Sequence, residues 1–141
     1  MNATAYPRRV ITGVDGSPNS VAALHRAVAE ARRGGTVLEV VLVIPGCPDP
    51  GAYAAALTKL SDILTLEYPD GPGVPVREKV EHGDPATTLV ELADGAALLV
   101  IGARSRSEAG NPLGGEVVPV CMNRAPCPLA VCADHSQHAG V

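Results

Sequence analysis

Residues 10–18 read Val-Ile-Thr-Gly-Val-Asp-Gly-Ser-Pro, an apolar run that opens directly into a polar turn. Much later in the chain a second apolar run, 98–101, opens into Gly102, and a polar loop follows as far as Gly114 and Gly115. If both runs are parallel strands, both loops leave the sheet at the carboxyl ends of strands, which is where such sheets bind ligands. We therefore expect Asp15 and the glycine-bounded loop to share a site suited to a nucleotide.

Composition restricts the class of protein. The chain has 141 residues, which suits one domain with a single core. With 46% hydrophobic and 18% charged residues it should be globular, and with no Trp or Phe its core must use Val, Leu, Ile and Ala. The net charge of -4 argues against nucleic acid as a partner. No apolar stretch approaches the roughly 20 residues needed to cross a bilayer, so no membrane is expected.

We expect one domain over 1–141, with its core in 8–132 and a polar tail in 133–141. The first residues, 1–4, carry no apolar signal segment, which favours a cytoplasmic location. In the cytoplasm the four cysteines should be reduced and buried as small hydrophobes. Cys132, His135 and His138 fit no standard zinc spacing, so no metal site is predicted.

Valine-rich runs alternate with segments of helical periodicity. The predicted strands span 8–14, 36–44, 74–81, 97–101 and 127–132. The predicted helices span 18–33, 52–67, a segment starting at 85, and 117–124, and the second of them is expected to direct Leu57, Leu60, Ile63 and Leu64 to one side. Ser17 and Asp84 each precede a proline, the pattern of a helix cap followed by Pro at the first helical position. The alternation predicts an α/β fold, a doubly wound parallel sheet with helices on both faces.

The order of these segments resembles the universal stress protein family over about residues 8–132. The resemblance rests on Val14-Asp15-Gly16-Ser17, Gly83-Asp84-Pro85, Leu98–Gly102 and Ala125–Val131. It implies a five-stranded sheet in the order 3-2-1-4-5 and a homodimer, often formed through the last strand. Some members of the family bind ATP and others do not.

In the ATP-binding members the resemblance implies a pattern of Gly, two residues, Gly, nine residues, Gly, and then Ser or Thr. Gly102 and Gly115 match the outer glycines, but Ser105 stands at the middle glycine. Glu116 stands at the hydroxyl position, and Val118 at a further small hydroxyl residue two places on. The phosphate side of the site therefore departs from the pattern.

The adenosine side matches better. Asp15 corresponds to the acidic residue that the ATP-binding members place near adenosine, and Val43 lies where the backbone would meet adenine. The alternative for Asp15 is a turn in which its carboxylate accepts a hydrogen bond from the backbone near Ser17, and one carboxylate can do both. Ser17 is read as a helix cap and not as a nucleophile, because the chain has no Gly-x-Ser-x-Gly elbow.

The charged residues in and just after the loop that follows Gly102 give the remaining evidence about phosphate binding. Arg104 and Arg106 suit phosphate contacts, although ordinary solvation of a surface loop is the favoured interpretation. Glu116 in a first helical turn gains roughly 0.3–1 kcal/mol from the helix dipole. Beside a phosphate about 4 Å away, the repulsion is on the order of 4 kcal/mol at an effective dielectric of 20.

Two functions follow. The first is a non-catalytic, dimeric stress-response protein with a degraded adenine-nucleotide site, and the alternative is an ATP- or AMP-binding regulatory module that uses the same cleft. An enzyme is not predicted, because no nucleophile lies beside a base and only Asp15 and Glu116 could meet in the cleft.

Overall fold

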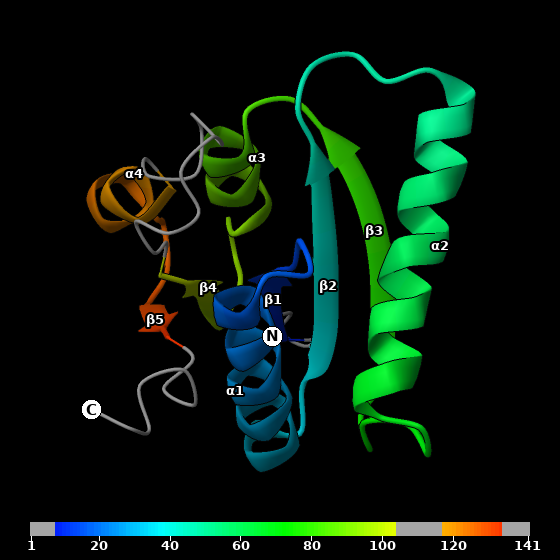
Figure 1. Cartoon of the computed structure of the whole chain (residues 1–141). Coiled ribbons are helices and arrows are strands. Elements are labelled where there is room, and N and C mark those ends of the chain that lie inside the picture. The colour runs from blue at the N-terminus through cyan, green and yellow to red at the C-terminus, as the bar shows by residue number, and fades with distance from the viewer. Residues whose placement is uncertain (1–7, 104–116, 134–141) are drawn as a thin grey trace, which may run out of the picture.

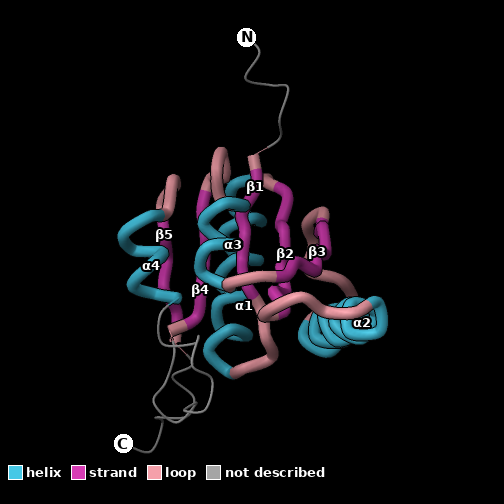
Figure 2. Tube along the Cα trace, turned by 90° about the horizontal axis from the view of Figure 1, so that it is seen from above, coloured by secondary structure: helices cyan, strands magenta, loops and turns pink. Residues whose placement is uncertain are grey.

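In the computed structural model, residues 8–103 and 117–133 are described, and they form a parallel sheet with helices on both faces (Figure 1). The elements in chain order are β1 (Arg9–Gly13), α1 (Pro18–Gly34), β2 (Val37–Ile44), α2 (Pro50–Glu67), β3 (Val76–His82), α3 (Pro85–Leu92), β4 (Leu98–Gly102), α4 (Val117–Arg124) and β5 (Leu129–Cys132). The five strands are ordered β3-β2-β1-β4-β5 and every neighbouring pair is parallel. This confirms the predicted fold and strand order, which Figure 2 shows from above.

Alternation along the strands separates two cores. Val10 and Val14 of the first strand region face α1 and α2, and Ile11 faces α3 and α4. The first core is completed by Leu24 of α1 and Leu60 of α2, both fully buried. Because successive side chains of a strand point to opposite faces, valine-rich strands covered on both sides read as unbroken apolar runs.

Three helices begin with the same N-cap arrangement, in which a side chain accepts a hydrogen bond from the backbone of the first turn. The Ser17 hydroxyl accepts a hydrogen bond from the Ser20 N–H at 3.3 Å, and the Asp84 carboxylate accepts one from the Thr87 N–H at 3.0 Å, so both predicted caps are confirmed. The Asp49 carboxylate does the same for the Ala52 N–H at 2.8 Å. As a result α2 begins at Pro50 and not at residue 52, because Asp49-Pro50 repeats the cap-proline signal.

Two expectations about burial were wrong. Leu57 is 49% exposed, since the buried stripe of α2 runs through Ala56, Leu60 and Leu64 at four-residue spacing and leaves Leu57 turned outward. The cysteines are all free thiols, but Cys121 alone is fully buried. Cys47 lies exposed in the loop between β2 and α2, where no second layer covers it.

Within the described ranges, no helix is both long and apolar enough to cross a membrane. The same residues contain no cluster of three or more His, Cys, Asp or Glu side chains arranged to hold a metal ion.

Candidate functional site

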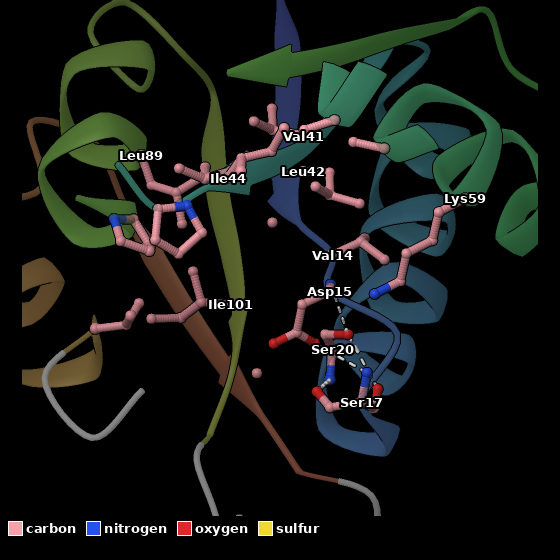
Figure 3. Close-up of a pocket in the computed structure, with 18 of the residues that line it drawn as sticks. Val14, Asp15, Ser17, Ser20, Val41, Leu42, Ile44, Lys59, Leu89 and Ile101 are labelled. Atoms are coloured by element: carbon pink, nitrogen blue, oxygen red, sulfur yellow. Dashed lines mark hydrogen bonds between the residues drawn. The ribbon is translucent and has the colours of Figure 1, made fainter. Parts of the chain in front are cut away.

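A cleft of about 560 Å³ opens at the carboxyl edge of the sheet, lined by described residues of β1, β2 and β4 and of the helices around them (Figure 3). The helix that follows β1, α1, packs on one face of the sheet, and the helix that follows β4, α4, packs on the other. This is the switch point at which doubly wound sheets bind ligands. The volume is in the range of small-molecule sites.

The turn after β1 forms one wall. The Asp15 carboxylate accepts a hydrogen bond from the Ser17 N–H at 2.9 Å, which is the turn considered as an alternative for this residue. The Asp15 N–H donates to the Ser20 hydroxyl at 3.2 Å, and that hydroxyl donates to the Ser17 carbonyl at 3.0 Å. Ser17 and Ser20 are therefore engaged in holding the turn. The Asp15 side chain also reaches into the cleft (Figure 3), so the turn does not exclude a role in ligand binding.

Gly102 lines the cleft at the end of β4, and its small size has a structural cause. A Cβ at this position would lie 2.6 Å from the backbone C and O of Asn19 and 2.8 Å from the N of Ser20. The first turn of α1 therefore packs directly on the backbone of β4. The Asn19 amide donates to the Ala103 carbonyl, and the Ala103 N–H donates to the Cys132 carbonyl at 2.7 Å, which pins the chain where it leaves β4.

Val43 lines the cleft near the end of β2 and packs on the face of the sheet that α3 and α4 cover, where Leu89 of α3 also lines the cleft. On the opposite face, Ala52, Ala55 and Ala56 of α2 line the cleft with short side chains. A slot with apolar walls and few polar groups suits a flat, mostly apolar ring.

Lys59 is the charged lining residue that the sequence did not predict. It follows Ala52, Ala55 and Ala56 at the spacing of one helix face, and this spacing is the signal that could have found it. In Figure 3 it extends from α2 toward Val14 and Asp15. Among the described residues that line the cleft, Asp15 and Lys59 are the charged ones.

The structure thus brings together three of the predicted site residues, Asp15, Val43 and Gly102. The other four, Arg104, Ser105, Gly115 and Glu116, lie outside the described residues, so their roles stay predictions. Val117, the first residue of α4, lines the cleft directly after that segment.

Comparison with known proteins agrees with this architecture. The model of the Universal stress protein family matches residues 7–133. A universal stress protein of Mycobacterium tuberculosis strain H37Rv is 28% identical over 144 residues, which cover 96% of this chain and 51% of the relative. The chain spans about half the length of the curated relatives it matches.

Solved structures give the same result. A universal stress protein in complex with cAMP is 26% identical, with a TM-score of 0.67 and coverage of 92% of this chain and 99% of that one. The universal stress protein from Archaeoglobus fulgidus in complex with dAMP shares the fold at 24% identity, with a TM-score of 0.69 and coverage of 90% and 98%.

Proposed function

The chain belongs to the universal stress protein family, and we propose that it is a non-catalytic stress-response protein with a weakened adenine-nucleotide site. The observation that carries this proposal is the shared cleft, in which Asp15 and Val43 line an apolar slot. Two solved relatives were determined with cAMP and with dAMP. An adenosine group matches a slot that offers apolar walls and one carboxylate for hydroxyl groups.

We assign the weaker nucleotide binding to the part of the site that is expected to contact the phosphates. Glu116 introduces a negative charge where the ATP-binding members of the family have a hydroxyl, and Ser105 replaces a glycine. Val118, at the second hydroxyl position, packs partly buried against the core of α3 and α4 and offers no hydrogen bond through its side chain. These changes should lower the affinity for a triphosphate more than the affinity for adenosine.

The alternative is a regulatory module that binds ATP or AMP in the same cleft. The size of the cleft favours it, since about 560 Å³ is ample for a nucleotide. The two functions differ in the expected order of affinities: the weakened site prefers adenosine and AMP to ATP, and the intact module binds ATP as well as it binds adenosine.

Calorimetric titration with adenosine, AMP, ADP and ATP, with and without magnesium, separates the two. For the unmodified protein we expect weak or undetectable ATP binding. Replacing Glu116 with Ser should raise ATP affinity much more than adenosine affinity, because a like charge is removed from the phosphates alone. The gain in ATP affinity relative to adenosine affinity should become smaller as added salt screens the charges.

Glu91→Ser serves as the matched control, since it removes the same charge from an exposed position of α3 outside the cleft. Tight ATP binding by the unmodified protein, with no loss from adenosine to ATP, would contradict the weakened site and support the alternative module.

We further propose that the protein is a homodimer that pairs through β5 and acts in the cytoplasm. β5 is an edge strand with a partly apolar surface, and Val131 is 43% exposed on it. An exposed apolar edge strand is stabilised by pairing with a second copy.

A further inference from the structure

Asn19, in the first turn of α1, contacts the exit of β4 in two ways. Its backbone lies against Gly102, where a Cβ would come within 2.6 Å of the Asn19 C and O atoms. Its side-chain amide donates a hydrogen bond to the carbonyl of Ala103, the next residue of the chain. Gly102 and Ala103 both line the cleft, so Asn19 holds one wall of it.

The residue after Asn19 holds a second wall, the turn that follows β1. The Ser20 hydroxyl accepts a hydrogen bond from the Asp15 N–H at 3.2 Å and donates one to the Ser17 carbonyl at 3.0 Å. Asp15 and Ser17 line the cleft on this side, as Figure 3 shows. Because Asn19 and Ser20 are adjacent in one helical turn, they hold the turn after β1 and the exit of β4 in a fixed relative position.

The two walls matter differently to different parts of a ligand. A nucleotide bound as proposed directs its sugar toward Asp15 and its phosphates past Gly102 and Ala103, so it meets both walls at once. Free adenine occupies the apolar slot and needs neither wall. Walls that are already in place when the ligand arrives lower the entropy cost of binding, and this gain is available only to a ligand that contacts both.

We infer that Asn19 is a positioning residue of the cleft, which keeps the turn after β1 and the exit of β4 at the separation that a nucleotide requires. This inference rests on the proposed adenine site and adds a residue that acts on it through the cleft walls. Among the described residues, Asn19 is not one of those that line the cleft.

The test is titration of adenine and AMP into the unmodified protein, Asn19→Ala and Asn19→His at about pH 8, where an ordinary imidazole is neutral. Asn19→Ala should lower AMP affinity about fivefold, the scale of one hydrogen bond, and leave adenine affinity unchanged. Asn19→His places a ring N–H as many bonds from the backbone as the Asn amide, so it should restore AMP affinity.

Amide hydrogen exchange provides a second readout, which needs no ligand. The Ala103 N–H donates to the Cys132 carbonyl at 2.7 Å, and the Val14 N–H donates to the Val41 carbonyl at 2.8 Å. Asn19→Ala should accelerate exchange several-fold at Ala103, where the chain leaves β4, and leave exchange at Val14 unchanged.

Asn123→Ala is the matched control, because it makes the same substitution at an exposed position of α4 that does not line the cleft. It should change neither the affinities nor the exchange rates. If Asn19→Ala lowers adenine and AMP affinity equally, or leaves AMP affinity unchanged, the positioning role is overturned while the adenine site stands. If the unmodified protein binds neither compound, the proposed adenine site itself fails, and the inference fails with it.

Discussion

Gly102 shows how a single residue serves both the site and the fold. The family resemblance assigns it to nucleotide binding, and the structure adds that a side chain there would collide with the backbone of Asn19 and Ser20 at 2.6 to 2.8 Å. Backbone atoms in the first turn of a helix cannot move aside as a flexible side chain can. The requirement for glycine at this position therefore does not depend on a ligand.

We expect Gly102→Ala to lower the free energy of unfolding by about 1–3 kcal/mol, the usual cost of overpacking. Urea unfolding without any nucleotide measures this loss. Gly34→Ala is the matched control, since a Cβ there meets only Thr36 Cγ2 at 3.4 Å and the residue is helical. It should leave stability unchanged or raise it by up to about 1 kcal/mol. Equal stability of the two variants would contradict the close packing of α1 on β4.

Glu39 is a second case at the residue scale. It is 2% exposed in the middle of β2, where an apolar residue is expected. Its carboxylate lies 3.4 Å from Arg9, 3.5 Å from Arg77 and 3.6 Å from Lys79, which come from the two strands on either side. Arg9 in turn donates to the carbonyls of Leu92 and Asp94 at 2.8 and 2.7 Å. A buried carboxylate surrounded by three cations keeps its charge compensated.

At the scale of elements, α4 is held against α3 and the sheet through Cys121, its one fully buried residue. Burial raises the pKa of the Cys121 thiol from 9.0 to about 11, and the negative charge of Asp84 adds to the shift. In the unfolded chain the thiol ionises at its ordinary value, so between these two values the unfolded state releases a proton that the folded state retains. The contribution of the buried Cys121 thiol to the free energy of unfolding is therefore fully present below pH 9 and is lost as the pH rises toward 11.

We therefore expect the stability difference between the unmodified protein and Cys121→Ala to narrow as the pH rises from 9 to about 11. Thermal melts at closely spaced pH values measure it. Cys47→Ala, which removes an exposed thiol, should show no such narrowing. A difference that stays constant across this range would mean that Cys121 is not buried as the packing of α4 requires.

At the scale of the whole molecule, the open edge of β5 decides whether the proposed dimer can form. The Leu99 N–H donates to the Pro128 carbonyl and the Ala103 N–H to the Cys132 carbonyl, so these residues direct their carbonyls to β4. By the alternation of a strand, the N–H and C=O groups of Val131 face outward. Pro128 precedes the strand, and its missing N–H leaves the outer edge intact.

We expect light scattering to give a mass of twice 14.4 kDa for the unmodified protein at tens of micromolar. Val131→Pro should convert it to a monomer with an unchanged circular dichroism spectrum, because the substitution removes an outward donor and leaves the pairing with β4 in place. Val131→Thr keeps the donor and should remain a dimer. A monomeric unmodified protein would rule out pairing through β5.

The sequence alone was sufficient for the positions of the strands, the caps at Ser17 and Asp84, and the alternating α/β class. These features depend on neighbours within one or two turns, and residue patterns report such neighbours directly. The strand order came from the family resemblance. For the site, the turn after β1 and the end of β4 were identified because both follow strands with recognisable polar exits.

The tertiary structure alone decided which residues meet across long separations. Asn19 and Ala103 are 84 positions apart, and Glu39 finds partners on both neighbouring strands, so no local pattern reveals either contact. Lys59 reads as an ordinary polar residue on a helix until the packing of α2 turns it into the cleft. Periodicity predicts that a helix face is buried or exposed, but what that face contacts depends on how distant segments pack. The same reason explains why Leu57 was wrongly expected on the inner side of its helix.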